Sequence, residues 1–210
     1  MTDSPPTAAE LARKYDDAAP RWGDKMRMLG YYDAYLGLLS GSSFRARPGG
    51  RVLDIGSGTG AFAEAWVATH RAAQAVTLLD PSPQMLVRGR AALARRDVAV
   101  ETAEALLEQH RTDAGYDNLL AAHILEHCPD PADTLRQMRR LVGLGARLWL
   151  VLSKPHWCNA IIWFQWRHRA YRPAEVTRML AATGWELDME YAFPAGPPSR
   201  TSRGYIARAV

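Results

Sequence analysis

The chain has 210 residues, of which 48% are hydrophobic and 23% charged, and its formal net charge is +4 at pH 7. This composition is typical of a folded globular protein, and the length corresponds to one domain that can bury a full core. The basic residues are scattered along the chain with no run of five or more, so no concentrated nucleic-acid patch is predicted. No apolar run approaches the roughly 18–20 residues that a membrane-spanning helix needs.

The N-terminal part of the chain, residues 1–45, is predicted to form a helical cap or lid. Residues 8–18 are compatible with a helix that Pro20 interrupts. Residues 26–39 carry apolar side chains at helical spacing. A loop rich in serine, glycine and proline follows over residues 41–50 and separates this part from the rest of the chain.

The rest of the chain alternates between strand and helix patterns. Strands are predicted at 51–55, 75–80, 97–101, 116–123, 146–152, 186–193 and 204–210, and helices at 60–70, 83–94, 103–110, 131–142 and 173–182. Apolar strands that alternate with helices predict a parallel sheet covered on both faces. The connection between the last two strands is too short for a crossover helix, so the final strand is expected to run antiparallel.

The most informative motif is the decapeptide at residues 51–60, Arg-Val-Leu-Asp-Ile-Gly-Ser-Gly-Thr-Gly. An apolar run ends in an acid, and three glycines at alternate positions lead into a helix. Glycine lets the backbone turn sharply and lets a ligand approach the main chain without a Cβ in the way. The N-terminus of the following helix offers N–H groups and the positive end of the helix dipole. The motif therefore predicts a site for a nucleotide-like ligand with an anionic or polar segment.

Two nucleotide ligands are consistent with this loop. Gly56, Gly58 and Ala61 fit the dinucleotide pattern with alanine in third place. Asp80, about 20 residues further on, stands where that pattern has its ribose-binding acid. Asp54, however, lies two residues before the first glycine, where it would repel a pyrophosphate and attract a cationic ammonium or sulfonium group. This favours S-adenosylmethionine (SAM) over NAD.

The spacing Asp-x-Gly-x-Gly-x-Gly, from Asp54 to Gly60, resembles motif I of the class I SAM-dependent methyltransferases. Within that class the chain is most similar to the methyltransferase domain 11 group, with specific motifs over about residues 50–153. The resemblance implies a Rossmann-like α/β fold with a seven-stranded, mostly parallel sheet in the order 3-2-1-4-5-7-6, the last strand antiparallel and helices on both faces. It also implies one methyltransferase domain over residues 1–210, with SAM as cofactor and S-adenosylhomocysteine as product.

The same resemblance implies which residues bind SAM. At the end of the second strand Asp80 would take both ribose hydroxyls, and Met85 would pack near the adenine. Ala103 and Glu104 follow the third strand, where the family places the adenine amino group. The predicted cofactor-binding residues are Asp54, Gly56, Ser57, Gly58, Gly60, Asp80, Pro81, Met85, Ala103, Glu104 and His123.

Residues 153–171, after the fifth strand, contain three tryptophans, a phenylalanine and a tyrosine. Ligand crevices lie at the carboxyl ends of parallel strands, so this insertion is well placed to form one wall of a pocket for a flat, apolar acceptor. Two alternatives are that the aromatic side chains pack a helix onto the sheet, or that residues 157–171 form an interfacial helix in weak contact with a membrane. The predicted acceptor-pocket residues are Tyr15, Trp22, His156, Trp157, Trp163 and Trp166.

Methyl transfer from a sulfonium needs little acid–base chemistry, so no catalytic triad is expected. His123, at the end of the fourth strand, is the first candidate base for a hydroxyl acceptor; the alternative is that it only lines the cofactor pocket. His127, on the following loop, and Tyr15, in a Tyr-Asp segment similar to one that closes over SAM in this group, are further candidates. Asp130 and Pro131 look like an N-cap and a first helical residue. No metal site is predicted, because His123 and His127 lie at a strand-to-loop junction rather than on a helix.

The predicted function is a SAM-dependent methyltransferase that acts mainly by proximity on a small or medium, largely apolar, cyclic or aromatic acceptor. The alternatives are an NAD(P)-dependent oxidoreductase, which Asp54 and the lack of a Tyr-x-x-x-Lys pair weaken, and a non-catalytic SAM-binding module. Cys128 and Cys158, with no signal-peptide pattern, predict reduced thiols in a cytoplasmic protein. The expected partner is a small-molecule substrate of biosynthesis, with no nucleic acid, and the protein is expected to be a monomer or homodimer.

Overall fold

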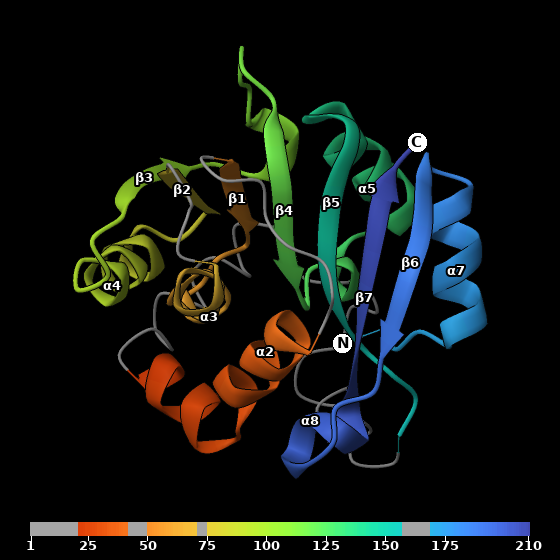
Figure 1. Ribbon diagram of the computed structural model, residues 1–210, viewed down its shortest axis with the longest axis horizontal. Helices are drawn as coiled ribbons and strands as arrows, with labels where there is room; N and C mark the ends of the chain where they lie inside the picture. Colours follow the sequence, from red (N-terminus) through yellow and green to blue (C-terminus); the bar gives the residue numbers. More distant parts are fainter. Residues whose placement is uncertain (1–20, 42–49, 71–74, 157–168) are drawn as a thin grey trace, which may run out of the picture.

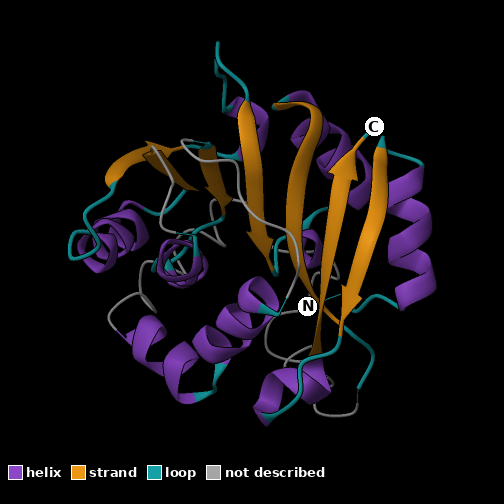
Figure 2. Ribbon diagram, in the orientation of Figure 1, coloured by secondary structure: helices purple, strands orange, loops and turns teal. Residues whose placement is uncertain are grey.

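The computed structural model describes residues 21–41, 50–70, 75–156 and 169–210. These residues form one seven-stranded sheet with helices on both faces (Figures 1 and 2). The strands are β1 (Arg51–Ile55), β2 (Ala75–Asp80), β3 (Ala99–Glu104), β4 (Tyr116–Ala122), β5 (Val142–Ser153), β6 (Trp185–Tyr191) and β7 (Ser202–Ala209). The helices are α2 (Tyr31–Ser40), α3 (Ala61–Thr69), α4 (Pro83–Leu93), α5 (Pro131–Arg140), α7 (Pro173–Ala181) and α8 (Gly196–Thr201), with short 3₁₀ turns η1 (Leu107–Gln109) and η2 (Leu125–His127).

The strand order is β3-β2-β1-β4-β5-β7-β6. The five strands from β3 to β5 are parallel, whereas β7 lies antiparallel between β5 and β6. The predicted order and the antiparallel last strand are therefore confirmed. From β1 the chain continues to β2 on one side, and β4 lies on the other side, so the carboxyl ends of β1 and β4 flank the topological switch point of the sheet. Ligands bind at this point in open α/β folds.

One face of the sheet is covered by α2, α3 and α4 (Figure 1). Leu38, Trp66 and Leu86, one from each helix, belong to a core that also includes Val52 and Trp149 of the sheet. Successive residues of a strand point to opposite faces, so one β-strand contributes to two cores. This first core supports the helix that follows the glycine loop.

The opposite face is covered by α5 and α7. Leu135 and Val176 of these helices pack with Leu53 of β1 and Leu148 of β5. Both helices begin with proline, and the Asp130 carboxylate accepts a hydrogen bond from the Asp133 N–H at 3.0 Å. The prediction of an N-cap at Asp130 is confirmed. The central parallel strands β1, β2 and β4 are buried on both faces, as their apolar sequences require, whereas β3 at the edge of the sheet is largely exposed.

The prediction of one continuous helix over residues 26–39 is wrong, because two helices separated at Gly30 occupy this part of the chain. Residues 21–28 are helical, the chain turns at Gly30 with φ 80°, and α2 begins at Tyr31. Apolar spacing continues across this break, so periodicity alone did not reveal it. Glycine takes the left-handed conformation without the steric cost that other residues incur, and here it redirects the chain between two helices. The predicted helix at 8–18 lies outside the described residues.

The predicted helix over 103–110 is also wrong. The strand β3 runs on to Glu104, and only the turn η1, Leu107–Gln109, is helical. Ala103 and Glu104 pair with Leu79 and Asp80 of β2. Pairing with a neighbouring strand therefore outweighs the helix propensity of these two residues. The short helix α8 between β6 and β7 was not predicted; it is compatible with an antiparallel β7 because it is not a crossover.

Candidate functional site

The glycine loop joins β1 to α3 and approaches α4 closely. Gly60 is the N-cap of α3 with φ 79°, and a Cβ at this position would lie 2.9 Å from the Cα of Gly89. Gly58 has φ 52° and a Cβ there would have no atom within 4 Å. Gly60 therefore lets the loop pack on α4, whereas the main chain at Gly58 borders open space that a ligand could enter.

Asp80 ties the end of β2 to this loop. Its Oδ2 accepts a hydrogen bond from the Gly58 N–H at 2.9 Å, and its Oδ1 accepts one from the Ser82 N–H at 2.9 Å. The Ser82 hydroxyl in turn caps α4 by accepting from the Met85 N–H at 3.1 Å. These bonds hold the Asp80 carboxylate beside the main chain of the glycine loop.

Asp54 is a nearly fully buried carboxyl at the end of β1, with 2% of its surface exposed. Its Oδ2 accepts a hydrogen bond from the Ala63 N–H at 3.1 Å in the first turn of α3. Burial raises the pKa of Asp54 to about 8; the Ala63 hydrogen bond opposes this rise, and the negative charge of Asp80 adds to it. A cation bound beside the two acids would favour the ionised form of Asp54 and so lower its pKa.

The remaining predicted cofactor residues lie beside these acids. Ser57 donates its N–H to the Leu79 carbonyl at 3.1 Å, and its buried hydroxyl has no hydrogen-bond partner within the described ranges. Glu104 and Ala103 lie at the carboxyl end of β3, next to the end of β2. Met85 is fully buried at the start of α4, and Pro81 is half-buried. The strand ends thus bring together the predicted residues from β1, β2 and β3.

His123 follows β4 directly and has a left-handed backbone with φ 58°. Its N–H donates to the Val151 carbonyl at 2.8 Å, which keeps it aligned beside β5. Its Nδ1 lies 2.9 Å from Oε1 of Glu126 and 3.2 Å from the Ser153 hydroxyl. Its Nε2 is buried without a hydrogen-bond partner in the described part of the chain. A non-glycine residue in this conformation is uncommon and occurs often at functional sites.

Glu126 anchors this group from the turn η2. Its side chain is fully buried, and Oε1 also accepts a hydrogen bond from the Ser153 N–H at 2.7 Å. Burial by itself would raise the pKa of Glu126, but the hydrogen bond and charge of His123, with the Ser153 N–H, outweigh burial and lower the pKa. Glu126 is therefore an ionised, buried carboxylate.

The cap helix α2 and the segment before β7 cover this group. The Tyr31 ring contacts the His123 ring edge to face, with ring centroids 5.4 Å apart. The Tyr31 hydroxyl lies 3.1 Å from the Thr201 hydroxyl and 3.3 Å from the Ser202 hydroxyl. The Tyr31 ring thus covers the cluster at the ends of β4, β5 and β7, and the Tyr31 hydroxyl lies within hydrogen-bond distance of the Thr201 and Ser202 hydroxyls.

Other predicted residues lie elsewhere. His127, at the end of η2, is half-buried, and burial lowers its pKa. Trp22 lies on the helix over residues 21–28, with the Lys25 ammonium 6.0 Å from its ring centroid. His156 follows β5 and is half-buried. The predictions for Tyr15, Trp157, Trp163 and Trp166, and most of the predicted membrane-contact segment, fall outside the described residues.

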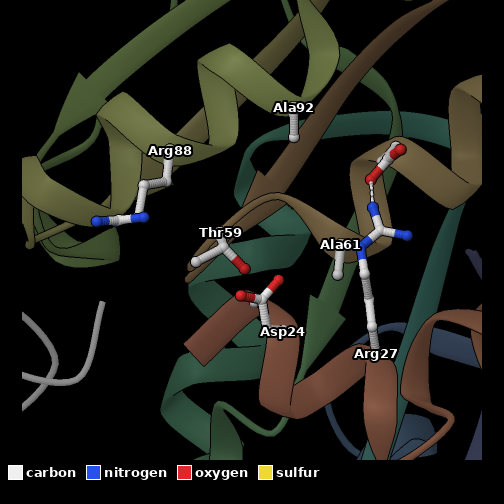
Figure 3. Close-up of a pocket in the computed structure, with 8 residues that line it drawn as sticks. Asp24, Arg27, Thr59, Ala61, Arg88 and Ala92 are labelled. Atoms are coloured by element: carbon white, nitrogen blue, oxygen red, sulfur yellow. Dashed lines mark hydrogen bonds and ion pairs between the residues drawn. The ribbon is translucent and has the colours of Figure 1, made fainter. Parts of the chain in front are cut away.

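A separate hollow of about 140 Å³ lies between residues 21–28, the glycine loop and α4 (Figure 3). Its walls include Asp24, which points toward Thr59, and Arg27, which pairs with Glu64 of α3. The lining does not include the strand-end acids or His123. The candidate site is therefore defined by the carboxyl ends of the strands and not by this hollow.

Three residues of the His123 cluster were not predicted to be part of the site. Glu126 and Ser153 carry polar groups beside the predicted base, and Tyr31 looked like one apolar position of a helix. The signal for Glu126 was its spacing: an acid three residues after a strand-end histidine can reach it if the chain turns at once. For Tyr31 and Ser153 the signal is absent from the sequence, because their contacts with the cluster join residues 27 or more positions apart.

The described ranges show neither a cluster of metal ligands nor a helix that could span a membrane. They contain no group of three or more histidine, cysteine or acidic residues that could hold a metal ion. In the same ranges, no helix combines the length and apolar character needed to cross a membrane. The Cys128 thiol is not in a disulfide, lies 3.4 Å from the Ile124 carbonyl, and has a pKa raised by burial.

Comparison with known proteins relates this geometry to methyl transfer. A family model described as a methyltransferase domain, Methyltransf_12, matches residues 53–148. A "Ubiquinone biosynthesis O-methyltransferase" from Paracidovorax citrulli is 32% identical over 154 residues, which cover 69% of this chain and 60% of that protein. A "2-methyl-6-phytyl-1,4-hydroquinone methyltransferase 1, chloroplastic" from Oryza sativa subsp. japonica is 34% identical over 95 residues, 45% of this chain and 28% of that protein. The chain thus spans less than two thirds of these relatives.

Solved structures share the fold at low sequence identity. The 1,6-didemethyltoxoflavin-N1-methyltransferase of Burkholderia thailandensis, with 1,6-didemethyltoxoflavin and S-adenosylhomocysteine bound, has a TM-score of 0.75 at 16% identity, covering 100% of this chain and 93% of that one. The magnesium protoporphyrin IX methyltransferase of Synechocystis PCC 6803, with SAM bound, has a TM-score of 0.69 at 17% identity and covers both chains fully. These likenesses concern the fold.

Proposed function

We propose that this chain, which belongs to the class I SAM-dependent methyltransferase family, binds SAM and transfers its methyl group to a hydroxyl on a small or medium, largely apolar, cyclic or aromatic acceptor. The observation that carries the proposal is one arrangement. Buried acids at the ends of β1 and β2 flank the glycine loop, and a histidine–glutamate pair follows the adjacent strand β4. The first part suits the cofactor and the second suits an acceptor that must lose a proton.

The residues at the strand ends fit SAM. Asp80 would bind the ribose hydroxyls from the end of β2, where the Gly58 N–H holds its carboxylate beside the loop, and the open main chain at Gly58 would border the ligand. Asp54 and the unpartnered hydroxyl of Ser57 would face its polar and cationic end. When bound, SAM supplies a methyl group already activated by the sulfonium. Met85, Ala103 and Glu104 would border the adenine.

The residues beyond β4 would act on the acceptor. Nε2 of His123 would accept the hydroxyl proton, since Nδ1 is engaged with Glu126. Tyr31 would help to exclude water, because α2 holds its ring against the imidazole. The remaining work is orientation, which in a bound pair of reactants can supply a large share of the rate.

The acceptor class is supported by the names of the relatives. The curated relatives are named as methyltransferases of ubiquinone biosynthesis and of a phytyl hydroquinone. A phenolic ring with an apolar substituent has the flat shape that aromatic side chains bind, and its hydroxyl gives His123 a role. We therefore propose a phenol or hydroquinone acceptor, with residues 153–171 as one wall and residues 1–45 as a cap.

Two other functions fit the site less well. A dinucleotide-dependent oxidoreductase is disfavoured because β7 is inserted antiparallel between β5 and β6, whereas the dinucleotide-binding fold has the order 3-2-1-4-5-6. A non-catalytic SAM-binding module would have the same cofactor residues, and only an assay of transfer separates it from an enzyme.

Calorimetry with SAM and NAD, followed by transfer assays with methyl-labelled SAM, tests the proposal. Catechol and 1,4-hydroquinone carry the hydroxyl, and benzylamine and thiophenol are the matched amine and thiol probes. We expect SAM binding, no NAD binding, and label on the phenols. NAD binding without SAM binding would contradict the family function, whereas label on the amine alone would contradict only the hydroxyl acceptor.

A second assay tests the proposed aromatic wall. Replacing Trp163 or Trp166 by Ala is expected to weaken acceptor binding and to leave SAM affinity nearly intact, because most of the predicted cofactor residues lie at the ends of β1, β2 and β3 or directly after these strands. An equal loss of SAM affinity, or unfolding, would mean that these tryptophans belong to the core. The analytical ultracentrifugation profile of the same variants would show whether the protein is a monomer or a homodimer and whether this segment affects that state.

A further inference from the structure

We infer that Glu126 is a positioning residue: it keeps the proton of the neutral His123 imidazole on Nδ1 and so leaves the lone pair on Nε2 for the acceptor hydroxyl. The catalytic consequence rests on the proposed function, but the tautomer is a property of the protein alone. Glu126 itself is not expected to touch the acceptor.

The direction of the hydrogen bonds around Glu126 assigns the tautomer. Oε1 accepts from the Ser153 N–H at 2.7 Å, a main-chain group that can only donate. The same Oε1 lies 2.9 Å from Nδ1 of His123, and an ionised carboxylate has no proton to give. Nδ1 must therefore be the donor, and in the neutral ring Nε2 is left without a proton.

The ring is held from three sides. Glu126 and Ser153 contact Nδ1, the main-chain N–H of His123 is bonded to Val151 at 2.8 Å, and the Tyr31 ring packs against the imidazole at 5.4 Å. The backbone conformation, with φ 58°, is one that non-glycine residues adopt at a cost. Such restraint is unnecessary for a histidine that only fills space, and it is what a base needs in order to meet a proton in one geometry.

Burying the Glu126 carboxylate also needs an explanation. Its side chain is fully buried, and Oε2 has no hydrogen-bond partner within the described ranges. A buried charge is costly unless hydrogen bonds compensate it, and the groups that donate to Oε1 in those ranges are the Ser153 N–H and Nδ1–H of His123. The other titratable groups that act on Glu126 or pack against His123 are tyrosines, a histidine and a thiol, Tyr31, Tyr35, His127, Cys128 and Tyr171. None of these is a carboxylate that could replace Glu126.

Two substitutions separate the charge of Glu126 from its acceptor atom. In Glu126→Gln the amide oxygen must face the Ser153 N–H, so it also faces Nδ1 and preserves the tautomer. In Glu126→Ala the carboxylate is lost and the neutral Ser153 hydroxyl, 3.2 Å from Nδ1, is the acceptor that remains in the described part of the chain, so the proton is expected to move in part to Nε2. Glu186→Gln is the matched control, because Glu186 is an exposed carboxylate on the edge strand β6, paired with Arg208.

The direct measurement is the nitrogen-15 spectrum of the histidine rings in the full-length protein with S-adenosylhomocysteine present, with His123 assigned from His123→Gln. Wild type, Glu126→Gln and Glu186→Gln are expected to show the neutral ring protonated at Nδ1, and Glu126→Ala a mixture. A wild-type ring protonated at Nε2 would overturn the inference, and this result needs no variant to fold. An unchanged tautomer in folded Glu126→Ala would overturn it equally.

Single-turnover transfer to catechol then tests the consequence. Glu126→Ala is expected to lower the rate about tenfold or more, part of the 10²–10⁴-fold that general-base help is worth. SAM affinity should be unchanged and Glu126→Gln should recover much of the rate. If the tautomer shifts in Glu126→Ala but neither it nor His123→Gln changes the rate, the base role in the proposed function fails, while the positioning of the ring by Glu126 stands. If the rate falls in Glu126→Ala but not in His123→Gln, the inference is overturned.

Discussion

The proposed cofactor end and the proposed acceptor end of the candidate site differ in how far apart in sequence their contacting residues lie. At the cofactor end, the polar contacts join residues close in sequence: Asp54 bonds Ala63, nine positions away, and Asp80 bonds Gly58, 22 positions away. At the acceptor end, Ser153 and His123 are 30 positions apart, and Tyr31 meets Thr201 across 170 positions. The first end is made by two adjacent strand–turn–helix units, the second by four separate segments.

This difference predicts which mutations change SAM affinity and which change methyl transfer alone. The cofactor end forms wherever β1 and β2 pair and their loops close, whereas the acceptor end forms only when β7 is inserted beside β5 and α2 packs across both. Mutations at the cofactor end should therefore affect SAM affinity and folding together. Mutations at the acceptor end should change transfer while SAM affinity stays constant.

The largest effect is expected at Gly60. Gly60→Ala combines a left-handed φ of 79° with a Cβ 2.9 Å from main-chain Gly89, so it should destabilise the protein by about 2–4 kcal/mol. Gly58→Ala is the matched control: it has a similar φ of 52° but no atom within 4 Å, and should cost about 1–2 kcal/mol. Urea denaturation measures both, and equal losses would mean that contact with α4 does not matter.

At Asp80, the cofactor end should lose affinity. Asp80→Ala removes charge-assisted bonds and should weaken SAM binding by about 1.5–3 kcal/mol. Asp80→Asn keeps one acceptor oxygen for the Gly58 N–H and should lose less. Isothermal calorimetry distinguishes them; an equal loss in both variants would assign the effect to charge alone, and no loss in either would remove Asp80 from the site.

Asp54 predicts how stability depends on pH. Its pKa is about 8 in the folded protein against an ordinary value of 3.8 for an aspartate side chain, so the folded state binds a proton that the unfolded state releases above pH 4. This contribution to stability is fully present below pH 4 and is lost as the pH rises to about 8. Between pH 5 and pH 8 the free energy of unfolding of the wild type should fall by at least about 1.4 kcal/mol more than that of Asp54→Asn, which is the equivalent of one pKa unit. If the difference in free energy of unfolding between wild type and Asp54→Asn is the same at pH 5 and pH 8 in denaturation experiments, the raised pKa is contradicted.

The smallest effect is expected at Tyr31. Tyr31→Phe keeps the ring against His123 but removes the hydroxyl near Thr201 and Ser202, so stability should fall by about 0.5–1.5 kcal/mol. SAM affinity should not change, and the KM for a phenolic acceptor should rise. Thermal unfolding and steady-state kinetics test this; a loss of SAM affinity equal to the loss of transfer would erase the distinction between the two ends.

Much of the fold followed from local patterns. The strand ends at Asp54 and Asp80, the glycine loop and the proline-led helices α5 and α7 all occur as predicted, because turns, caps and buried strands impose residue types on their own positions. The strand order came from resemblance to a family, not from periodicity. The break at Gly30 and the extension of β3 through Glu104 were not predicted. Helical spacing continues across Gly30, and residues with good helix propensity extend β3 because they pair with β2.

By itself the sequence determined the cofactor end: an acid, three glycines and a second acid specify a loop, a helix N-terminus and two carboxylates within one pair of βα units. Only the tertiary structure decided which residues surround His123 and Glu126 at the proposed acceptor end, where Ser153 contacts both side chains and Tyr31 covers the ring. The physical reason is the range of the interactions. Backbone conformation and capping depend on neighbours in sequence, whereas the partner of a buried side chain depends on which strands and helices pack beside it.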